Sequence, residues 1–347
     1  MNGEQFDTTY FNDKRVKFIA KSDPHERLAQ LFGGKYIAYR KKWVETAEGK
    51  DVLDYPLHLD IALNDTCNIR CHFCAFALPP GERGYKTLGA EKIPLPLFER
   101  IVSEGAQKGL CAVSFGNICE PLLVPDLEEY IKIAKRAGIL DLILYTNAML
   151  LTAERAASLI QAGLTWINIS ISAASAKTYE QMRDYANFNQ VISNSLGFIE
   201  AKKALKSELP LVRVSFVNTK QNCHELDAFV AFWQEKADVV SIQNLVNWHK
   251  GTIREKQFQE HFYLERTKAA EGSGVCTQPF QRLLIRNNGD ITPCCAFIGL
   301  NLVFGNVYKQ SVFEVYNSPE MKAFKATLNT PMRGNVCQQC REAYRCE

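Results

Sequence analysis

Between residues 57 and 245 the chain alternates short apolar segments with longer amphipathic ones, and this alternation restricts the fold more than any other feature. Near-continuous apolar strands separated by helices are typical of a parallel sheet with helices on its faces, because a parallel pair needs a long crossover connection. Six segments have this strand character. The predicted strands cover residues 56–65, 111–116, 140–146, 166–172, 211–218 and 239–245.

The segments between these strands carry helix signals, and Thr152 is the predicted N-cap of one of them. Six strands fit an open (β/α)6 partial TIM barrel better than a closed eightfold one, so the predicted fold class is α/β. The predicted helices cover residues 96–109, 126–138, 152–163, 176–185 and 224–237.

A barrel of parallel strands forms its site at the carboxyl ends of the strands. That rule brings polar side chains and thiols that are far apart in the sequence to one rim. The predicted rim consists of residues 67–74, Cys119, Glu120, Asn147, residues 170–172, Asn218 and residues 244–247.

The charge balance argues against nucleic acid as a partner. Lys and Arg number 41 against 38 Asp and Glu, and no basic tract is present. No apolar run approaches the roughly 20 residues that a membrane helix needs. The opening segment MNGEQFDTTY lacks the basic and apolar regions of a secretory signal. We therefore expect a cytoplasmic protein with no membrane and no nucleic-acid partner.

Nine of the twelve cysteines form two groups. In a reducing compartment, grouped cysteines are more often metal ligands or catalytic residues than disulfides. The first group, Cys67, Cys71 and Cys74, has the spacing C-x3-C-x2-C. A structural zinc site or a four-iron cluster usually takes four protein ligands, so three thiols leave one metal position open to a small molecule. Zinc binding and simple burial remain the alternatives.

Cys67, Cys71, Phe73 and Cys74 resemble the signature of the radical S-adenosylmethionine (SAM) enzymes, which has an aromatic residue before the last cysteine. The resemblance implies that the three cysteines bind a [4Fe–4S] cluster and that SAM is the ligand of its fourth iron. It also implies that SAM is cleaved to a radical that takes a hydrogen atom from a C–H bond. An electron donor such as flavodoxin or ferredoxin would then be a partner.

Further segments resemble motifs of this family in the same order, namely GNICEPLL (116–123), TNAMLL (146–151), SISAASAKTYEQMR (170–183) and VNTKQNCHEL (217–226). In the family, the acid of the first motif receives the SAM ammonium group, which assigns that role to Glu120. Cys119, Ala148 and Ser172 depart from the pattern, which usually has glycine at the first two positions and often an acid at the third. The implied SAM-binding residues are Phe73, Glu120, Pro121, Asn147, Ser170, Ser172, Arg183 and Asn218.

The second cysteine group lies near the end of the chain, around a predicted hairpin at residues 281–295. A zinc ribbon would explain the hairpin and the pair Cys337-x2-Cys340. Beside the first motif, however, the region resembles the auxiliary-cluster domain called SPASM, or twitch in its shorter form. This resemblance implies one auxiliary [4Fe–4S] cluster. Its implied ligands are Cys276, Cys294, Cys337 and Cys340.

The predicted organisation has four parts. An N-terminal helical extension covers residues 1–55, and the radical SAM partial barrel covers residues 56–245. A connector at 246–275 leads to a small cysteine-rich α+β domain of SPASM or twitch type at 276–347.

Two thiols bear on the type of reaction. Cys119 belongs to the predicted rim, and Cys295 follows an expected cluster ligand where the family's dehydrogenases resemble one another in having an acid. An S–H bond is weak, so a thiol suits the hydrogen donor of an epimerisation. Cys119 and Cys295 are therefore the predicted catalytic residues of a redox-neutral epimerisation. Oxidation of an alcohol by a dehydrogenase is the alternative.

The N-terminal extension is too short and too helical for the peptide-binding module that peptide-modifying members of the family often carry. We therefore expect a small-molecule substrate such as a sugar, an aminocyclitol or a nucleoside-like compound. Asn244 and residues 247–249, after the sixth strand, are candidate contacts to a polyol. A peptide-modifying maturase and a non-catalytic iron–sulfur scaffold are the other hypotheses.

Overall fold

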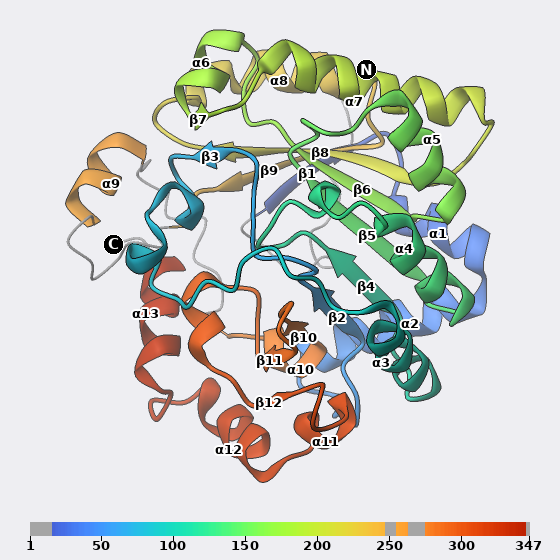
Figure 1. The fold of residues 1–347 in the computed structure, drawn as a ribbon, viewed down its shortest axis with the longest axis vertical. Helices are drawn as coiled ribbons and strands as arrows, with labels where there is room; N and C mark the ends of the chain where they lie inside the picture. The colour runs from blue at the N-terminus through green and yellow to red at the C-terminus, as the bar shows by residue number, and fades with distance from the viewer. Residues whose placement is uncertain (1–15, 247–254, 263–274, 345–347) are drawn as a thin grey trace.

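The computed structural model describes residues 16–246, 255–262 and 275–344. In this part of the chain a curved sheet of ten strands forms the centre of the molecule (Figure 1). Its six central strands are parallel and correspond, in chain order, to the six predicted strand segments. This confirms the α/β fold with a partial TIM barrel. These strands are β2 (His58–Ile61), β4 (Ala112–Phe115), β5 (Asp141–Thr146), β6 (Trp166–Ser170), β8 (Leu211–Asn218) and β9 (Val239–Asn244).

Helices cover the outer face of these strands (Figure 1). At the start of α5, the Thr152 hydroxyl accepts a hydrogen bond from the backbone N–H of Arg155, as the N-cap prediction requires. No helix in the described ranges is long and apolar enough to cross a membrane. The outer helices are α3 (Leu95–Gln107), α4 (Leu127–Arg136), α5 (Ala153–Ala162), α6 (Ala176–Gln181), α7 (Phe188–Ala204) and α8 (Leu226–Trp233).

The segment between β6 and β8 differs from the prediction. The helix expected at 176–185 ends at Gln181, and the short strand β7 (Arg183–Asp184) follows it. Helix α7, which the sequence analysis did not predict, packs through Val191, Phe198 and Ile199. A polar residue, Ser195, occupies a position in this buried stripe and donates its hydroxyl to the Val191 carbonyl at 2.6 Å. The serine hides the helical pattern from a hydrophobicity count.

The described part of the N-terminal extension, residues 16–55, contains one strand and two helices. Strand β1 (Val16–Ala20) pairs antiparallel with β9 at the edge of the sheet. Helices α1 (Pro24–Phe32) and α2 (Gly34–Ala47) place aromatic side chains against the first residues of the barrel strands, where Tyr36 and Trp43 join Trp166 in one core cluster. These helices therefore cover the amino-terminal end of the barrel.

The predicted hairpin is present as β10 (Arg282–Ile285) and β11 (Asp290–Thr292). Strand β12 (Gly305–Asn306) adds to β11, and β10 pairs in parallel with β2. The hairpin therefore continues the barrel sheet. In Figure 1 the elements after it, α11 (Val312–Tyr316), α12 (Pro319–Leu328) and α13 (Asn335–Tyr344), gather at one end of the molecule.

The predicted connector lies mostly outside the described residues, apart from α9 (Glu255–Phe262) and a short helix, α10 (Gln278–Gln281), that follows it. The division of the chain at residues 55, 245 and 275 stays a prediction.

Candidate active site

The three thiols of the first cysteine group lie in the loop that follows β2. The backbone N–H of Cys74 donates to the Cys71 carbonyl at 2.9 Å, which folds the loop back on itself. Burial raises the pKa of the Cys67 thiol to about 11 and that of Cys74 to about 12, and the neighbouring Cys71 contributes to both shifts. Thiolates crowded in this way need a cation between them, so the donor set fits a metal cluster.

A two-stranded sheet fixes this loop to the segment after β6. Strand β3 (Arg70–Cys71) pairs antiparallel with β7, so that Cys71 lies opposite Arg183. The His72 backbone N–H also donates to the Met182 carbonyl at 3.0 Å, and its ring lies 2.9 Å from Asp184. Two-residue strands leave no periodic pattern in a sequence, which is why the sequence analysis missed this contact.

The carboxylate of Glu120 is buried at the same rim. It accepts hydrogen bonds from the backbone N–H groups of Leu122 and Asn147, at 3.1 and 2.8 Å, and from the Thr146 hydroxyl at 2.8 Å. Burial nevertheless raises its pKa to about 7. A cationic amine beside this carboxylate would favour its charged form. Glu120 therefore fits the predicted acceptor for an ammonium group, and Pro121 is buried next to it.

Asn147 connects Glu120 to the first thiol. Its side-chain amide donates to Asn68 Oδ1 at 2.8 Å and lies 3.8 Å from Cys67 Sγ. The next residue, Ala148, has φ 60°, a left-handed conformation that explains why the family motif usually has glycine there. Asn147 and Glu120 thus converge on Cys67, as predicted.

Arg183 and Ser172 form the other side of the rim. The Ser172 hydroxyl accepts from the Val217 backbone N–H at 3.0 Å and from the Arg183 guanidinium at 3.2 Å. That guanidinium lies over the rings of Tyr179 and Phe73, at 4.5 and 5.7 Å, and interacts electrostatically with the Cys71 thiol. Ser172, Arg183 and Phe73 are therefore brought together beside the second thiol.

Among the remaining predicted rim residues, Asn218 keeps free hydrogen-bonding capacity, and residues 247–249 lie outside the residues that the structure describes. Asn218, at the end of β8, has a buried Oδ1 with no hydrogen-bond partner among the described residues. Ser170 ends β6 and is half-buried opposite Ser215. Asn244 ends β9, whereas residues 247–249 lie outside the described residues.

The four thiols expected to bind the auxiliary cluster lie close together. Burial raises the pKa of Cys294 well above its usual value, and the charges of Cys295, Cys340 and Cys276 contribute. Cys337 and Cys340 lie three residues apart in α13, on one face of the helix. A Cβ at Gly299 would lie only 2.5 Å from Cys294 Sγ, so glycine keeps this thiol accessible.

Asn329, which the sequence analysis missed, fixes the backbone of Cys276, one of the expected cluster ligands. Its side-chain oxygen accepts from the Cys276 backbone N–H at 2.8 Å, and its amide donates to the Cys276 carbonyl at 3.0 Å. No three His, Cys, Asp or Glu side chains of the described segments surround a single metal-ion position. Thiolates that bind a four-iron cluster are attached to different irons, so they stand further apart than the ligands of one zinc ion.

The two thiols predicted to be catalytic have apolar surroundings. Burial raises the pKa of Cys119 well above its usual value, and the nearby charges of Glu120 and Cys67 contribute. Cys295 packs against a cluster that contains Ala75, Ile118 and Leu284. Both thiols therefore lie near the rim. The raised pKa of the Cys119 thiol keeps it protonated at neutral pH.

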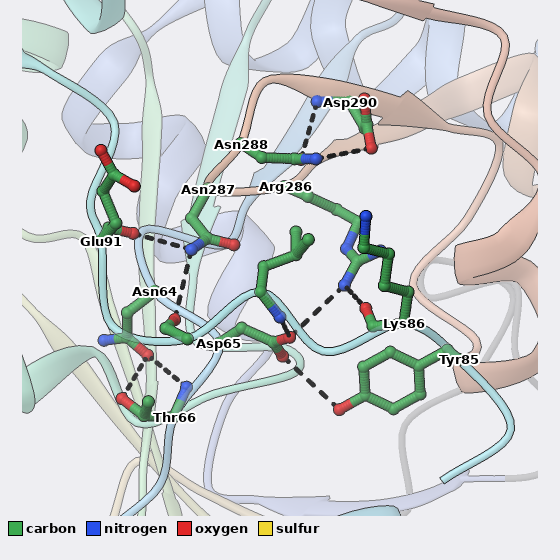
Figure 2. Close-up of polar contacts among 12 residues, drawn as sticks. Asn64, Asp65, Thr66, Tyr85, Lys86, Glu91, Arg286, Asn287, Asn288 and Asp290 are labelled. Carbon is green, nitrogen blue, oxygen red and sulfur yellow. Dashed lines mark hydrogen bonds and ion pairs between the residues drawn. The ribbon is translucent and has the colours of Figure 1, made fainter. Parts of the chain in front are cut away.

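A buried ion pair joins the first cysteine loop to the hairpin of the C-terminal region (Figure 2). Asp65, two residues before Cys67, lies 3.4 Å from the Arg286 guanidinium, and the two side chains are 1% and 3% exposed. Arg286 also donates to the Lys86 carbonyl at 2.5 Å and lies over the Tyr85 ring. We call these four residues, Asp65, Tyr85, Lys86 and Arg286, the loop clasp. Asn287 supports it by donating to the Glu91 carbonyl at 2.7 Å.

The comparisons with known proteins agree with these two cysteine sites. The model of the radical SAM superfamily matches residues 61–208, and that of the SPASM domain, an iron-sulfur cluster-binding domain, matches residues 276–341. The chain belongs to the radical SAM superfamily and carries a SPASM domain. Membership implies SAM with a [4Fe–4S] cluster, and in addition an auxiliary cluster, as cofactors.

Curated relatives of similar sequence are GTP 3',8-cyclases. The probable enzyme of Sulfurisphaera tokodaii is 27% identical over 207 residues, which are 60% of this chain and 61% of that protein. The enzyme of Desulforamulus reducens is 30% identical over 180 residues, 51% of this chain and 52% of the relative. The chain thus spans between half and two thirds of the length of these relatives.

Solved structures of low sequence identity share the fold. SuiB of Streptococcus suis, bound to the precursor peptide SuiA, gives a TM-score of 0.61 at 18% identity and covers 90% of this chain and 76% of its own. BtrN in complex with AdoMet and 2-DOIA gives 0.53 at 16% identity, over 82% of this chain and 92% of its own. These similarities support the radical SAM fold.

Gly116, the first residue of GNICEP, offers a test of how tightly this rim is packed. Its φ is 94°, and a Cβ would lie 2.3 Å from the Tyr145 carbonyl oxygen and 2.7 Å from Pro121 Cδ. We expect Gly116→Ala to lower the free energy of unfolding by at least about 2 kcal/mol, measured by urea denaturation of the apoprotein. Gly138→Ala is the matched control, because its φ is 90° but nothing lies within 4 Å of the added Cβ. Equal losses in the two variants would show that backbone strain alone accounts for the effect.

Proposed function

We propose that the chain is a radical SAM enzyme that removes a hydrogen atom from a C–H bond of a small polar substrate. The observation that carries this proposal is the convergence of Cys67, Glu120 and Asn147 at the carboxyl ends of the barrel strands. When bound, the cluster with SAM supplies radical chemistry that no side chain can perform alone. A non-catalytic iron–sulfur scaffold would have no need for the Glu120 carboxylate at this position.

The residues of the rim divide the binding of SAM between them. Glu120, buried and able to accept further hydrogen bonds, receives the ammonium group, and Arg183 faces the carboxylate group with Ser172 beside it. Asn147 fixes the loop around Cys67, and Phe73 supports the guanidinium of Arg183. Ser170 and Asn218 are available for the ribose, because the Asn218 Oδ1 atom has no partner among the described residues.

For the outcome of the reaction we propose a redox-neutral epimerisation. A thiol at Cys119 or Cys295 would give a hydrogen atom to the substrate carbon from the face opposite to the abstraction, and the sulfur would then recover an electron and a proton. An electron donor of the flavodoxin or ferredoxin class would supply that electron. The reduced thiols also favour a cytoplasmic location. A sugar, an aminocyclitol or a nucleoside-like molecule is the proposed substrate class, and the GTP 3',8-cyclase relatives favour the last of these.

The test is anaerobic purification and reconstitution, followed by measurement of iron, zinc and 5'-deoxyadenosine formation under a strong reductant. We expect about eight irons per chain, two four-iron clusters, and SAM cleavage that depends on the reductant. Zinc in place of iron, or no cleavage by the unmodified protein under any reductant, would refute the enzyme proposal. Epimerisation predicts solvent deuterium at the reacting carbon, lost in Cys295→Ala or Cys119→Ala, whereas dehydrogenation predicts an oxidised product without it.

A further inference from the structure

One arginine of the barrel strands has no acidic partner in the part of the chain that the structure describes. We propose that Arg213, together with Tyr145 and Asn168, binds an anionic oxygen group of the substrate, a phosphate or a carboxylate. This inference rests on the proposed function and names the class of substrate that the barrel takes.

The three residues form one row across neighbouring strands. Tyr145 on β5 lies opposite Asn168 on β6, and Asn168 lies opposite Arg213 on β8. All three are half-buried, whereas the residues just before them in each strand are buried in the main core. Since side chains alternate between the faces of a strand, the row points away from the helices and into the barrel, where it stays accessible to solvent.

Two buried polar atoms of this row, Arg213 Nε and Asn168 Oδ1, have no hydrogen-bond partner among the described residues. No carboxylate of the described chain lies within 4.0 Å of the Arg213 guanidinium. The guanidinium lies 5.7 Å from the centre of the Tyr145 ring. A half-buried guanidinium with no acid among its described neighbours can pair with an anion that a ligand brings.

Two other arginines near the hairpin show the usual arrangement. Arg282, which also lies beside the barrel interior, is 3.7 Å from Asp60, and Arg286 is 3.4 Å from Asp65. The sequence thus supplies acids to these arginines and leaves Arg213 without one, as expected of a residue whose counter-ion arrives with a ligand.

The position of the row assigns it to the substrate rather than to SAM. Tyr145 and Asn168 each lie two residues before the rim residues Asn147 and Ser170 of the same strands. Two residues of a strand span about 6–7 Å, so the row lies deeper in the barrel than the proposed SAM site. A substrate bound between the two would present its reacting carbon to the rim and its anionic group to Arg213.

The chemistry of the row suits an oxyanion. A guanidinium presents parallel N–H donors that match two oxygens of a phosphate or carboxylate. The Asn168 amide can donate to the same group after rotation, or accept from a neighbouring hydroxyl. Phosphorylated sugars, nucleotides and sugar acids all combine such a group with hydroxyls.

The experiment uses reconstituted protein with SAM bound and two probes, inorganic phosphate and acetate, in isothermal titrations at low ionic strength. We expect the unmodified protein to bind at least one of them. Arg213→Gln should weaken that binding about tenfold or more, and Arg213→Lys, which keeps the charge, should recover part of it. Tighter binding of phosphate indicates a phosphorylated substrate, and tighter binding of acetate a carboxylated one. The control is Arg27→Gln, which removes an arginine that pairs with Asp238 away from the barrel interior and should change nothing.

Three results would overturn the inference: no binding of either anion by the unmodified protein, equal binding by Arg213→Gln, or an equal loss of SAM affinity in that variant. The last would make Arg213 a ligand of the cofactor. SAM cleavage without substrate is measured in parallel. If the unmodified protein does not cleave SAM, the proposed function alone is refuted. If SAM cleavage is intact and Arg213→Gln binds the anions as the unmodified protein does, this inference alone is refuted.

Discussion

Replacement of Cys67, Cys71 and Cys74 together by alanine should abolish 5'-deoxyadenosine formation and lower the iron content from about eight to about four per chain. The three thiols are half-buried in one loop, and Cys71 contributes to the raised pKa of both Cys67 and Cys74, so they form one donor set. The four thiols expected to bind the auxiliary cluster lie outside this loop: Cys276 is bonded to Asn329, Cys294 follows β11, and Cys337 and Cys340 lie in α13. Iron bound there should therefore survive.

The control for this variant removes two thiols that belong to neither group. Cys111 lies at the foot of β4 and Cys223 is exposed at the start of a short helix before α8. The double variant Cys111→Ala, Cys223→Ala should keep all of its iron and its activity. If the triple variant also keeps about eight irons, or still cleaves SAM, the assignment of the first cluster to these three cysteines is wrong.

Replacement of Arg286 by alanine should lower the free energy of unfolding of the apoprotein by about 3–5 kcal/mol. The change leaves the Asp65 carboxylate buried without its cation, and it also removes the hydrogen bond to the Lys86 carbonyl and the contact with the Tyr85 ring. Urea denaturation under reducing conditions measures this loss. Because Asp65 is two residues before Cys67, we also expect slower incorporation of iron into the first site during reconstitution.

Two further variants test whether the Asp65–Arg286 ion pair of the loop clasp accounts for this loss of stability. Lys21→Ala removes an exposed partner of Glu235, and an exposed ion pair contributes little to stability because water and salt screen it. The double variant Asp65→Asn, Arg286→Met removes both charges and should recover part of the stability that Arg286→Ala loses, as a double-mutant cycle reveals. A loss in Arg286→Ala no larger than that in Lys21→Ala would contradict the role of the loop clasp.

Much of the barrel could be predicted from short stretches of sequence. The six strands, the N-cap Thr152 and the hairpin at 281–295 all follow from residues that are neighbours in the chain, because side-chain alternation, capping and turn formation are local effects. The rule that parallel strands place their carboxyl ends together then brought Glu120 and Asn147 to Cys67. Helix α7 escaped prediction because a serine lies within its buried stripe.

The sequence by itself determined the cysteine spacings, the strand order of the barrel and the family, since each is written in contiguous residues. Only the tertiary structure decided that β3 pairs with β7, that β10 pairs with β2, and that Arg286 meets Asp65 across 221 residues. It also decided that the buried Nε of Arg213 has no hydrogen-bond partner among the described residues. Such contacts depend on how distant segments pack, and the free energy of a buried charge depends on its surroundings in space, which no local spacing records.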